Sequence, residues 1–179
     1  MKKYLGKIVF MSLFISIPWI SWGQSIPLFK SPIQIGAKLL APFGENRIGY
    51  MHEGVDVDVP MWTPLYAVQD GIITKAAPDS KGVENGGGHM IFINHGDGME
   101  SRYMHLSLYA VNLGDKVKAG DLIGFSGDSG DATKPLLHYE LRSNNVPIDP
   151  NFIFEENQVW DKEGQALYDV PPSFLAPQT

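Results

Sequence analysis

The sequence contains no cysteine among its 179 residues. Disulfide bonds and cysteine nucleophiles are therefore excluded, and so is lipid attachment to a cysteine behind the apolar N-terminal run. Stability has to come from a hydrophobic core and, where one is bound, from a metal ion.

Positive charge is also scarce. The chain has 14 lysine and arginine residues against 20 aspartate and glutamate residues, which gives a net charge of −6. Nucleic acids and anionic membrane surfaces attract basic proteins, so the charge balance argues against either as the main partner.

Long hydrophobic runs are missing except at the N-terminus. The run at 8–20 follows three lysines and is short for a membrane span. Ser21 and Gly23 then offer small residues at the two positions that a signal peptidase reads. We expect residues 1–23 to be a signal peptide, the mature protein to be periplasmic or secreted, and no membrane span to remain. An uncleaved N-terminal anchor is the alternative.

Removal of this segment leaves 156 residues and changes the net charge from −6 to −9, because the segment holds three lysines and no acidic residue. That length is sufficient for one domain with a substantial core. We divide the remainder into an N-terminal lead-in at 24–37, a β domain at 38–153 and a C-terminal tail at 154–179.

No window between 24 and 150 shows sustained helical periodicity. Glycine and proline together supply 32 of the 179 residues, above a usual share of about 12%. They separate short apolar runs, which predicts an all-β domain of short antiparallel strands arranged as a sandwich or a partly closed barrel. The expected strands lie at 64–68, 71–77, 89–95, 101–106, 121–127 and 136–142.

The segment K-V-K-A-G-D-L-I-G at 116–124 predicts a compact hairpin with a glycine corner. Similar hairpins occur in biotinyl and lipoyl carrier domains, which modify a lysine in a specific local sequence. Neither Lys116 nor Lys118 has that setting, so we interpret the hairpin as structural.

Two stretches, M-H-E-G-V-D at 51–56 and L-L-H-Y-E at 136–140, provide His52, Asp56 and His138. Two imidazoles and a carboxylate form the ligand set of hydrolytic zinc sites that keep a fourth position open. Four residues of straight strand span about 13 Å, so His52 and Asp56 share one ion only if the chain bends, which Gly54 permits. In isolation, H-x-x-x-D is more often a surface pair.

The stretch L-L-H-Y-E-L-R has the alternation of a strand with one apolar face. Glu140 shares a face with His138 and could orient a ligand histidine. An exposed strand position for His138 is the alternative. The alternation places Leu137, Tyr139 and Leu141 on one face and Leu136, His138, Glu140 and Arg142 on the other.

These blocks, in this order, resemble the lysostaphin-type zinc metallopeptidases over roughly residues 38–153. The resemblance implies a β fold with a groove, one zinc ion held by His52, Asp56 and His138, a catalytic role for His105, and action on peptide bonds of bacterial peptidoglycan. The blocks that carry it are A-P-F-G-E-N-R (41–47), H-E-G-V-D-V-D-V-P (52–60), T-P-L-Y-A-V-Q-D-G-I-I (63–73), G-G-G-H-M-I-F-I-N-H-G-D-G (86–98), Y-M-H-L-S (103–107), G-D-K-V-K-A-G-D-L-I-G-F-S-G-D-S-G (114–130) and L-H-Y-E-L (137–141).

One position departs from the family pattern. The family's last block is His-x-His, and its first histidine works with the histidine at the position of His105. Leu136 stands there in this chain. A positioned acid or base is typically worth about 10²–10⁴-fold in rate, so we expect reduced activity. Tyr50 is a candidate phenolic donor and His89 a weaker substitute, whereas we interpret His95 as structural.

Two functions are compatible with these residues. The first is an exported zinc metalloendopeptidase, and the second is a catalytically impaired zinc-binding module that binds cell-wall peptides or regulates another wall hydrolase. A regulatory protein partner is compatible with both. A carrier or phosphocarrier domain explains neither the export signal nor the metal-ligating residues.

Overall fold

The computed structural model describes residues 29–154. The expected signal peptide lies outside this range, and so does the expected tail apart from Phe154. The predicted all-β class is confirmed, since the described elements are twelve strands and one short 3-10 helix, η1. Within residues 29–154, no helix has the length and hydropathy needed to cross a membrane. The elements are β1 (Lys38–Ala41), β2 (Asn46–Arg47), β3 (Tyr50–Met51), β4 (Val55–Asp58), β5 (Pro64–Tyr66), β6 (Gly71–Pro78), β7 (His89–Gly96), β8 (Met99–Tyr109), β9 (Lys116–Val117), β10 (Leu122–Ser126), β11 (Leu137–Ser143), β12 (Val146–Ile148) and η1 (Asn151–Ile153).

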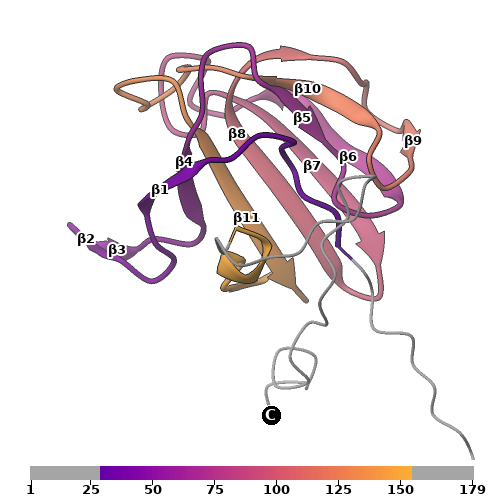
Figure 1. Cartoon of the computed structure of the whole chain (residues 1–179), viewed down its shortest axis with the longest axis horizontal. Coiled ribbons are helices and arrows are strands. Elements are labelled where there is room, and N and C mark those ends of the chain that lie inside the picture. The colour runs from indigo at the N-terminus through magenta and orange to yellow at the C-terminus, as the bar shows by residue number, and fades with distance from the viewer. Residues whose placement is uncertain (1–28, 155–179) are drawn as a thin grey trace, which may run out of the picture.

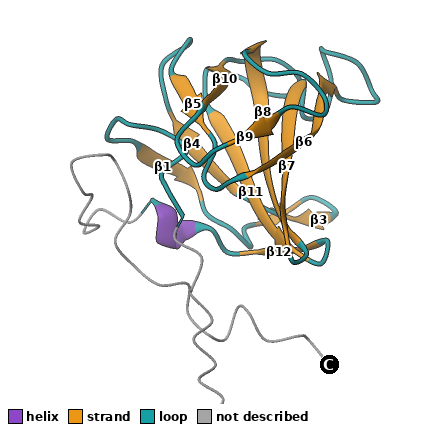
Figure 2. Cartoon of the chain, turned by 90° about the vertical axis from the view of Figure 1, so that its right-hand side faces the viewer, coloured by secondary structure: helices purple, strands orange, loops and turns teal. Residues whose placement is uncertain are grey.

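The described strands pair antiparallel in one large open sheet of order β1-β4-β11-β8-β7-β6-β9 (Figure 1). The strands β10 and β5 branch from this sheet at β8, and β12 extends from β11. Figure 2 shows how strongly the sheet curves, so that its strands enclose a core without closing into a barrel. The short hairpin of β2 and β3 stands apart from the sheet.

The branch divides β8 into two parts. Residues 99–104 pair with β11, whereas Leu106, Leu108 and Tyr109 pair with β10. His105 lies between the two parts and has a positive φ of 62°. It therefore occupies the point at which β8 changes partner.

Alternation determines which residues form the core. On β4, Val55 and Val57 are buried among apolar side chains while Asp56 between them faces the other way. The predicted core face of β11 is confirmed, since Leu137, Tyr139 and Leu141 are fully buried. The opposite face of β11 is covered as well, which excludes the exposed alternative for His138.

All six predicted strands are present, with ends that differ from the prediction by at most three residues. The hairpin predicted at 116–124 is wrong, because β9 pairs with β6 while β10 pairs with β5 and β8. The physical reason lies at the corner, where the N–H of Gly120 donates to the carbonyl of Ala67. That bond directs the chain across to β5 instead of back along β9.

Residues of the lead-in contribute to the core. Phe29 and Ile33 are both buried in the main hydrophobic cluster. The ring of Phe29 packs edge-on against Phe152, with 6.0 Å between the centroids. The first and last parts of the described chain therefore lie side by side.

Candidate metal centre

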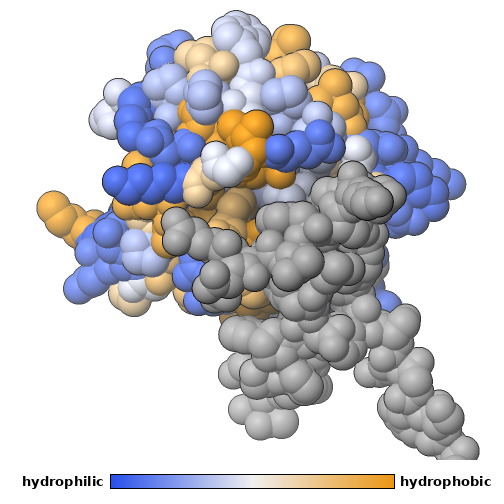
Figure 3. All heavy atoms as spheres, in the orientation of Figure 1, coloured by the Kyte–Doolittle hydropathy of each residue, from blue (hydrophilic) through white to orange (hydrophobic). Residues whose placement is uncertain are grey.

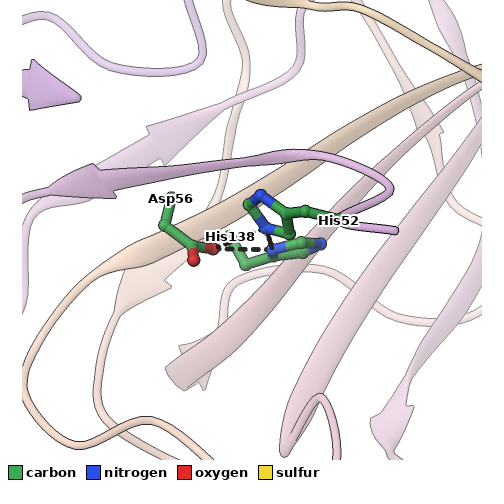
Figure 4. A group of neighbouring side chains, drawn as sticks. All are labelled: His52, Asp56 and His138. Atoms are coloured by element: carbon green, nitrogen blue, oxygen red, sulfur yellow. Dashed lines mark hydrogen bonds and ion pairs between the residues drawn. The ribbon is translucent and has the colours of Figure 1, made fainter. Parts of the chain in front are cut away.

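Three side chains from two strands and a bend converge on one point (Figure 4). Nδ1 of His138 lies 2.7 Å from Oδ1 of Asp56 and 3.1 Å from Nε2 of His52. Nε2 of His52 lies 3.2 Å from the same carboxylate oxygen. All three residues are at most 9% exposed, so these donor atoms meet inside the protein.

The chain bends at Gly54, as the spacing of His52 and Asp56 requires. Glycine is needed there for a reason other than the backbone freedom that was expected. Its φ is not in the left-handed region. A Cβ at this position would instead collide with the carbonyl oxygen of Tyr139 and lie 3.0 Å from Nε2 of His138. Glycine is therefore needed for close approach, since the bend packs directly on β11.

Each histidine has a hydrogen-bond acceptor at its outer ring nitrogen. Nδ1 of His52 donates to the carbonyl oxygen of Pro42 at 2.8 Å, and Nε2 of His138 donates to Oε1 of Glu140 at 3.3 Å. In neutral rings that carry these protons, the two inner nitrogens would present lone pairs to one another and to Oδ1 of Asp56. Such an arrangement is unfavourable unless a cation lies between them.

Asp56 keeps its negative charge in this buried place. Burial favours the neutral carboxyl, but hydrogen bonds with His138 and His52 outweigh it and hold the pKa of Asp56 well below its usual range. The second carboxylate oxygen, Oδ2, accepts a hydrogen bond from Nη2 of Arg47 at 2.7 Å. Arg47 thus fixes the carboxylate with Oδ1 toward the histidines.

The chemistry of these donors fits zinc. Zinc prefers imidazole nitrogen and carboxylate oxygen at about 2.0–2.2 Å in tetrahedral geometry. Donor atoms separated by 2.7–3.2 Å are close enough to share one such ion. Hydrogen bonding of each outer ring nitrogen is also the usual support of a zinc-bound histidine.

Behind His138 a network of charged residues extends to the surface. Glu140 forms a very short ion pair with Nη1 of Arg142, which also binds Oε2 of Glu53 at 2.9 Å. Burial opposes a charge on His138, but Asp56 and Glu140 outweigh it and raise the pKa of His138. The position between these two carboxylates therefore favours a positive charge, either a proton or a metal ion.

His105 approaches the same centre from β8. Its ring centroid lies 6.0 Å from that of His138, with the rings nearly perpendicular. Nδ1 of His105 donates to the carbonyl oxygen of Ser129 at 2.8 Å, which leaves Nε2 with a lone pair. Burial lowers the pKa of His105, so its imidazole is neutral at neutral pH.

Ser129 is itself held firmly. Its hydroxyl donates to the carbonyl of Leu106 at 2.8 Å and accepts from the N–H of His89 at 2.9 Å. Gly88 packs so closely that a Cβ on it would overlap the Ser129 side chain. The carbonyl that orients His105 is therefore fixed by three segments of the chain.

The backbone of Leu136 pairs with Gly127, which in turn packs on the backbone of His105. The N–H of Leu136 donates to the carbonyl of Gly127 at 3.1 Å. A Cβ on Gly127 would lie 3.0 Å from the carbonyl oxygen of His105. Leu136 and His105 thus flank the same glycine, and the Leu136 side chain is half-buried.

The remaining candidates lie elsewhere. Tyr50 is 59% exposed on the β2–β3 hairpin, whose hydrophobic residues stand out at the far left of Figure 3, and its hydroxyl contacts Arg47. Nδ1 of His89 bonds to the hydroxyl of Tyr109 at 2.7 Å. His95 lies between the carbonyl of Asp70 and the hydroxyl of Ser101. Both histidines therefore have partners outside the metal centre.

The arrangement of donors on a curved antiparallel sheet agrees with the comparison to known families. The sequence profile of peptidase family M23 matches residues 50–150, more than half of the chain. The chain belongs to peptidase family M23. Residues 51–56, 103–107 and 136–140, which hold the four residues around the candidate centre, all lie within the matched range.

Individual M23 proteins resemble this chain in sequence and in structure. It is 43% identical over 135 residues to lysostaphin of Staphylococcus simulans, covering 73% of this chain and 26% of lysostaphin. It is 41% identical over 118 residues to the DD-carboxypeptidase/endopeptidase Mpg of Neisseria meningitidis, covering 63% of this chain and 26% of that protein. The chain therefore spans about a quarter of the length of these curated relatives.

Solved structures give the same result. The catalytic domain of the antimicrobial peptidase lysostaphin from S. simulans superposes with a TM-score of 0.58 at 37% identity, covering 66% of this chain and 93% of that domain. A zinc containing peptidase from Vibrio cholerae superposes with a TM-score of 0.63 at 25% identity, covering 73% of this chain and 40% of that chain. Membership of M23 identifies the chain as a peptidase by family.

Sequence reasoning missed three groups that support the candidate centre. Arg47 lies within the A-P-F-G-E-N-R block, but its spacing from Asp56 gave no sign of an ion pair. Ser129 lies in a stretch that predicts only a turn. Pro42 contributes a backbone carbonyl, and such a contribution leaves no signature in residue type.

Proposed function

We propose that this protein is an exported zinc metalloendopeptidase that acts on peptide bonds of bacterial peptidoglycan, in the periplasm or outside the cell. The observation that carries the proposal is the convergence of His52, Asp56 and His138, whose inner ring nitrogens lie 3.1 Å apart and 3.2 Å and 2.7 Å from one carboxylate oxygen. One zinc ion is the cofactor that this donor set suits best.

When bound, zinc supplies Lewis acidity to the scissile carbonyl group and to water. His52, Asp56 and His138 would hold the ion, and Arg47 and Glu140 would keep the Asp56 and His138 donors in place. The buried, electrically compensated surroundings restrict water around the reacting groups, which strengthens electrostatic interactions there.

His105 is the proposed catalytic acid and base. Because Nδ1 of His105 donates to Ser129, Nε2 is free to accept a proton from the attacking water and to return it to the departing amine. The lowered pKa of His105 keeps this nitrogen unprotonated at neutral pH. Tyr50, exposed on the neighbouring hairpin, is a further candidate donor to the substrate.

Leu136 reduces the expected rate. Leucine neither donates nor accepts a proton, and it flanks Gly127 opposite His105, where a second imidazole would stabilise developing charge. We therefore infer an activity about 10²–10⁴-fold below that of an otherwise equal site with two histidines.

The same observation favours a second candidate function. A zinc-holding but catalytically impaired domain would bind cell-wall peptides, or regulate another wall hydrolase through a protein contact. Wall peptides are the partner in both proposals, and the acidic net charge of −6 argues against nucleic acid in either.

Zymography on peptidoglycan separates the two. We expect weak clearing by the native chain, at least 10-fold stronger clearing by Leu136→His, and none in the presence of a zinc chelator. His105→Ala in the Leu136→His background should abolish the gain. Bound zinc without clearing in either form would support the binding module, whereas strong native clearing that Leu136→His leaves unchanged would remove Leu136 from the catalytic arrangement.

A further inference from the structure

Trp62 combines a strained backbone with an exposed side chain. Its φ is 68°, and the residue is 58% exposed. Positive φ is tolerated by asparagine and aspartate but is a genuine outlier for a bulky residue. The other non-glycine residues with positive φ in the described range are Asp97, His105, Asn144 and Asn145. Three of these are asparagine or aspartate, which tolerate positive φ, and His105 belongs to the candidate centre, so Trp62 is the bulky residue whose conformation these reasons do not explain.

The turn around Trp62 prefers glycine at this position. The N–H of Thr63 faces the carbonyl of Pro60 at 3.3 Å, which closes a four-residue turn with Trp62 third. Positive φ at the third position alone defines a type II turn, in which glycine is favoured. The turn is held by Ser126, whose carbonyl accepts from the N–H of Trp62 at 3.0 Å and whose hydroxyl donates to Pro60 at 2.7 Å. Nothing in this backbone requires an indole.

The turn is linked through the backbone to the strand that passes His105. Ser126 directly precedes Gly127, which separates Leu136 from the backbone of His105. The loop that begins after β4 is also joined to the loop before β11, because Nζ of Lys134 pairs with Oδ1 of Asp58 at 2.9 Å. Ser126 and Gly127 therefore connect the Trp62 turn to the backbone around His105 and Leu136.

We propose that Trp62 is a sugar-binding subsite, where a pyranose ring of the glycan strand stacks on the indole while the attached peptide lies at the metal centre. This inference rests on the proposed function. An indole offers a flat apolar face with one polar edge, which suits a ring with an apolar C–H face and hydroxyls around it. Asp58, four residues before Trp62, and its partner Lys134 are half-exposed and offer an acceptor and donors for hydroxyl groups. Because Ser126 holds the backbone of the turn, binding costs little backbone entropy there.

A direct binding measurement tests this subsite without any need for hydrolysis. Of the four tryptophans, Trp19 and Trp22 lie in the segment expected to be removed on export, so Trp160→Phe in the mature chain leaves Trp62 as the one indole fluorophore. We expect a saturable change in its emission with a β-1,4-linked N-acetylglucosamine oligosaccharide, and a smaller one or none with a sugar-free stem peptide. A response to the peptide alone, or to neither probe, overturns the proposal.

Two variants of Trp62 add a second readout. Trp62→Gly should raise the midpoint of thermal unfolding by about 2–5 °C, because it relieves the backbone strain. It should also weaken oligosaccharide binding at least 10-fold and raise KM for sugar-linked peptides with kcat unchanged. Trp62→Phe should retain most of the affinity. If Trp62→Gly instead lowers the unfolding midpoint and leaves binding intact, the indole is a packing residue and the subsite is wrong. If the chain binds the sugar but cleaves no peptide, the peptidase proposal is wrong and the subsite proposal stands.

Discussion

Arg47 and Asp56 form an ion pair in which the guanidinium contacts one carboxylate oxygen and leaves the other to the histidines. The Nη2–Oδ2 distance is 2.7 Å, and Oδ1 lies 2.7 Å from Nδ1 of His138. Because Arg47 fixes this carboxylate, its inner oxygen needs no further reorganisation to bind a metal ion. A fixed carboxylate of this kind is a better metal ligand than a mobile acidic side chain.

The first prediction concerns zinc content. Asp56→Ala should reduce bound zinc from about one ion per chain to a small fraction of that, because it removes the only carboxylate donor of the three converging groups. Metal analysis after exhaustive dialysis measures this. Asp58→Ala is the matched control, since Asp58 is two residues further along β4 and pairs with Lys134. Unchanged zinc in Asp56→Ala would remove Asp56 from the ligand set.

Glu140 should influence affinity without touching the ion. Glu140→Gln weakens the acceptor for Nε2–H of His138. It also removes the carboxylate on β11 that pairs with the buried Arg142. Changes of such outer partners typically cost about 10–100-fold in metal affinity. Competition with a chromophoric chelator measures the effect. Glu53→Gln, at the exposed end of the same network, should change affinity by less than about 3-fold.

Gly88 controls the position of His105 through Ser129. An alanine Cβ at residue 88 would lie 2.5 Å from the carbonyl carbon of Ser129, so the loop that holds Ser129 must shift. The Ser129 carbonyl oxygen, which accepts from His105, moves with it. We expect Gly88→Ala to retain zinc and to lose at least about 10-fold in peptide cleavage. Gly82→Ala is the control, because Gly82 also has positive φ but faces open space. Equal losses in both variants would mean that backbone strain alone is responsible.

His95 should make stability depend on pH. Burial lowers the pKa of His95 below its ordinary value of 6.5, so below that pH the unfolded chain binds a proton that the folded protein resists. The free energy of unfolding should therefore decrease as the pH falls below about 6.5, with a slope of up to about 1.4 kcal/mol per pH unit from this residue. Urea unfolding from pH 8 to pH 5 should show a shallower decrease for His95→Gln. Parallel curves for both proteins would contradict the assignment.

Much of the fold was predictable because the strands are regular. Leu137, Tyr139 and Leu141 alternate without interruption, so one period determines the face that enters the core. The corner at Gly120 was not predictable, since the strands on either side pair with distant partners that no local pattern identifies. Pairing between sequence-distant strands is a property of the whole chain.

The candidate centre, too, was predictable from the sequence only in part. The spacing of His52 and Asp56 required a bend, and a bend is present at Gly54. His105 has a left-handed backbone at the branch of β8, and simple alternation would place its side chain differently. Its approach to His138 therefore followed from family resemblance and not from periodicity.

The contact between Phe29 and Phe152 has an architectural consequence. Since the domain's entry and exit meet at one place, a longer polypeptide could accommodate it as a loop-like insertion, with flanking modules left as near neighbours. Linker length on either side would then set how far the candidate metal centre can reach from such modules, independently of the residues that form it.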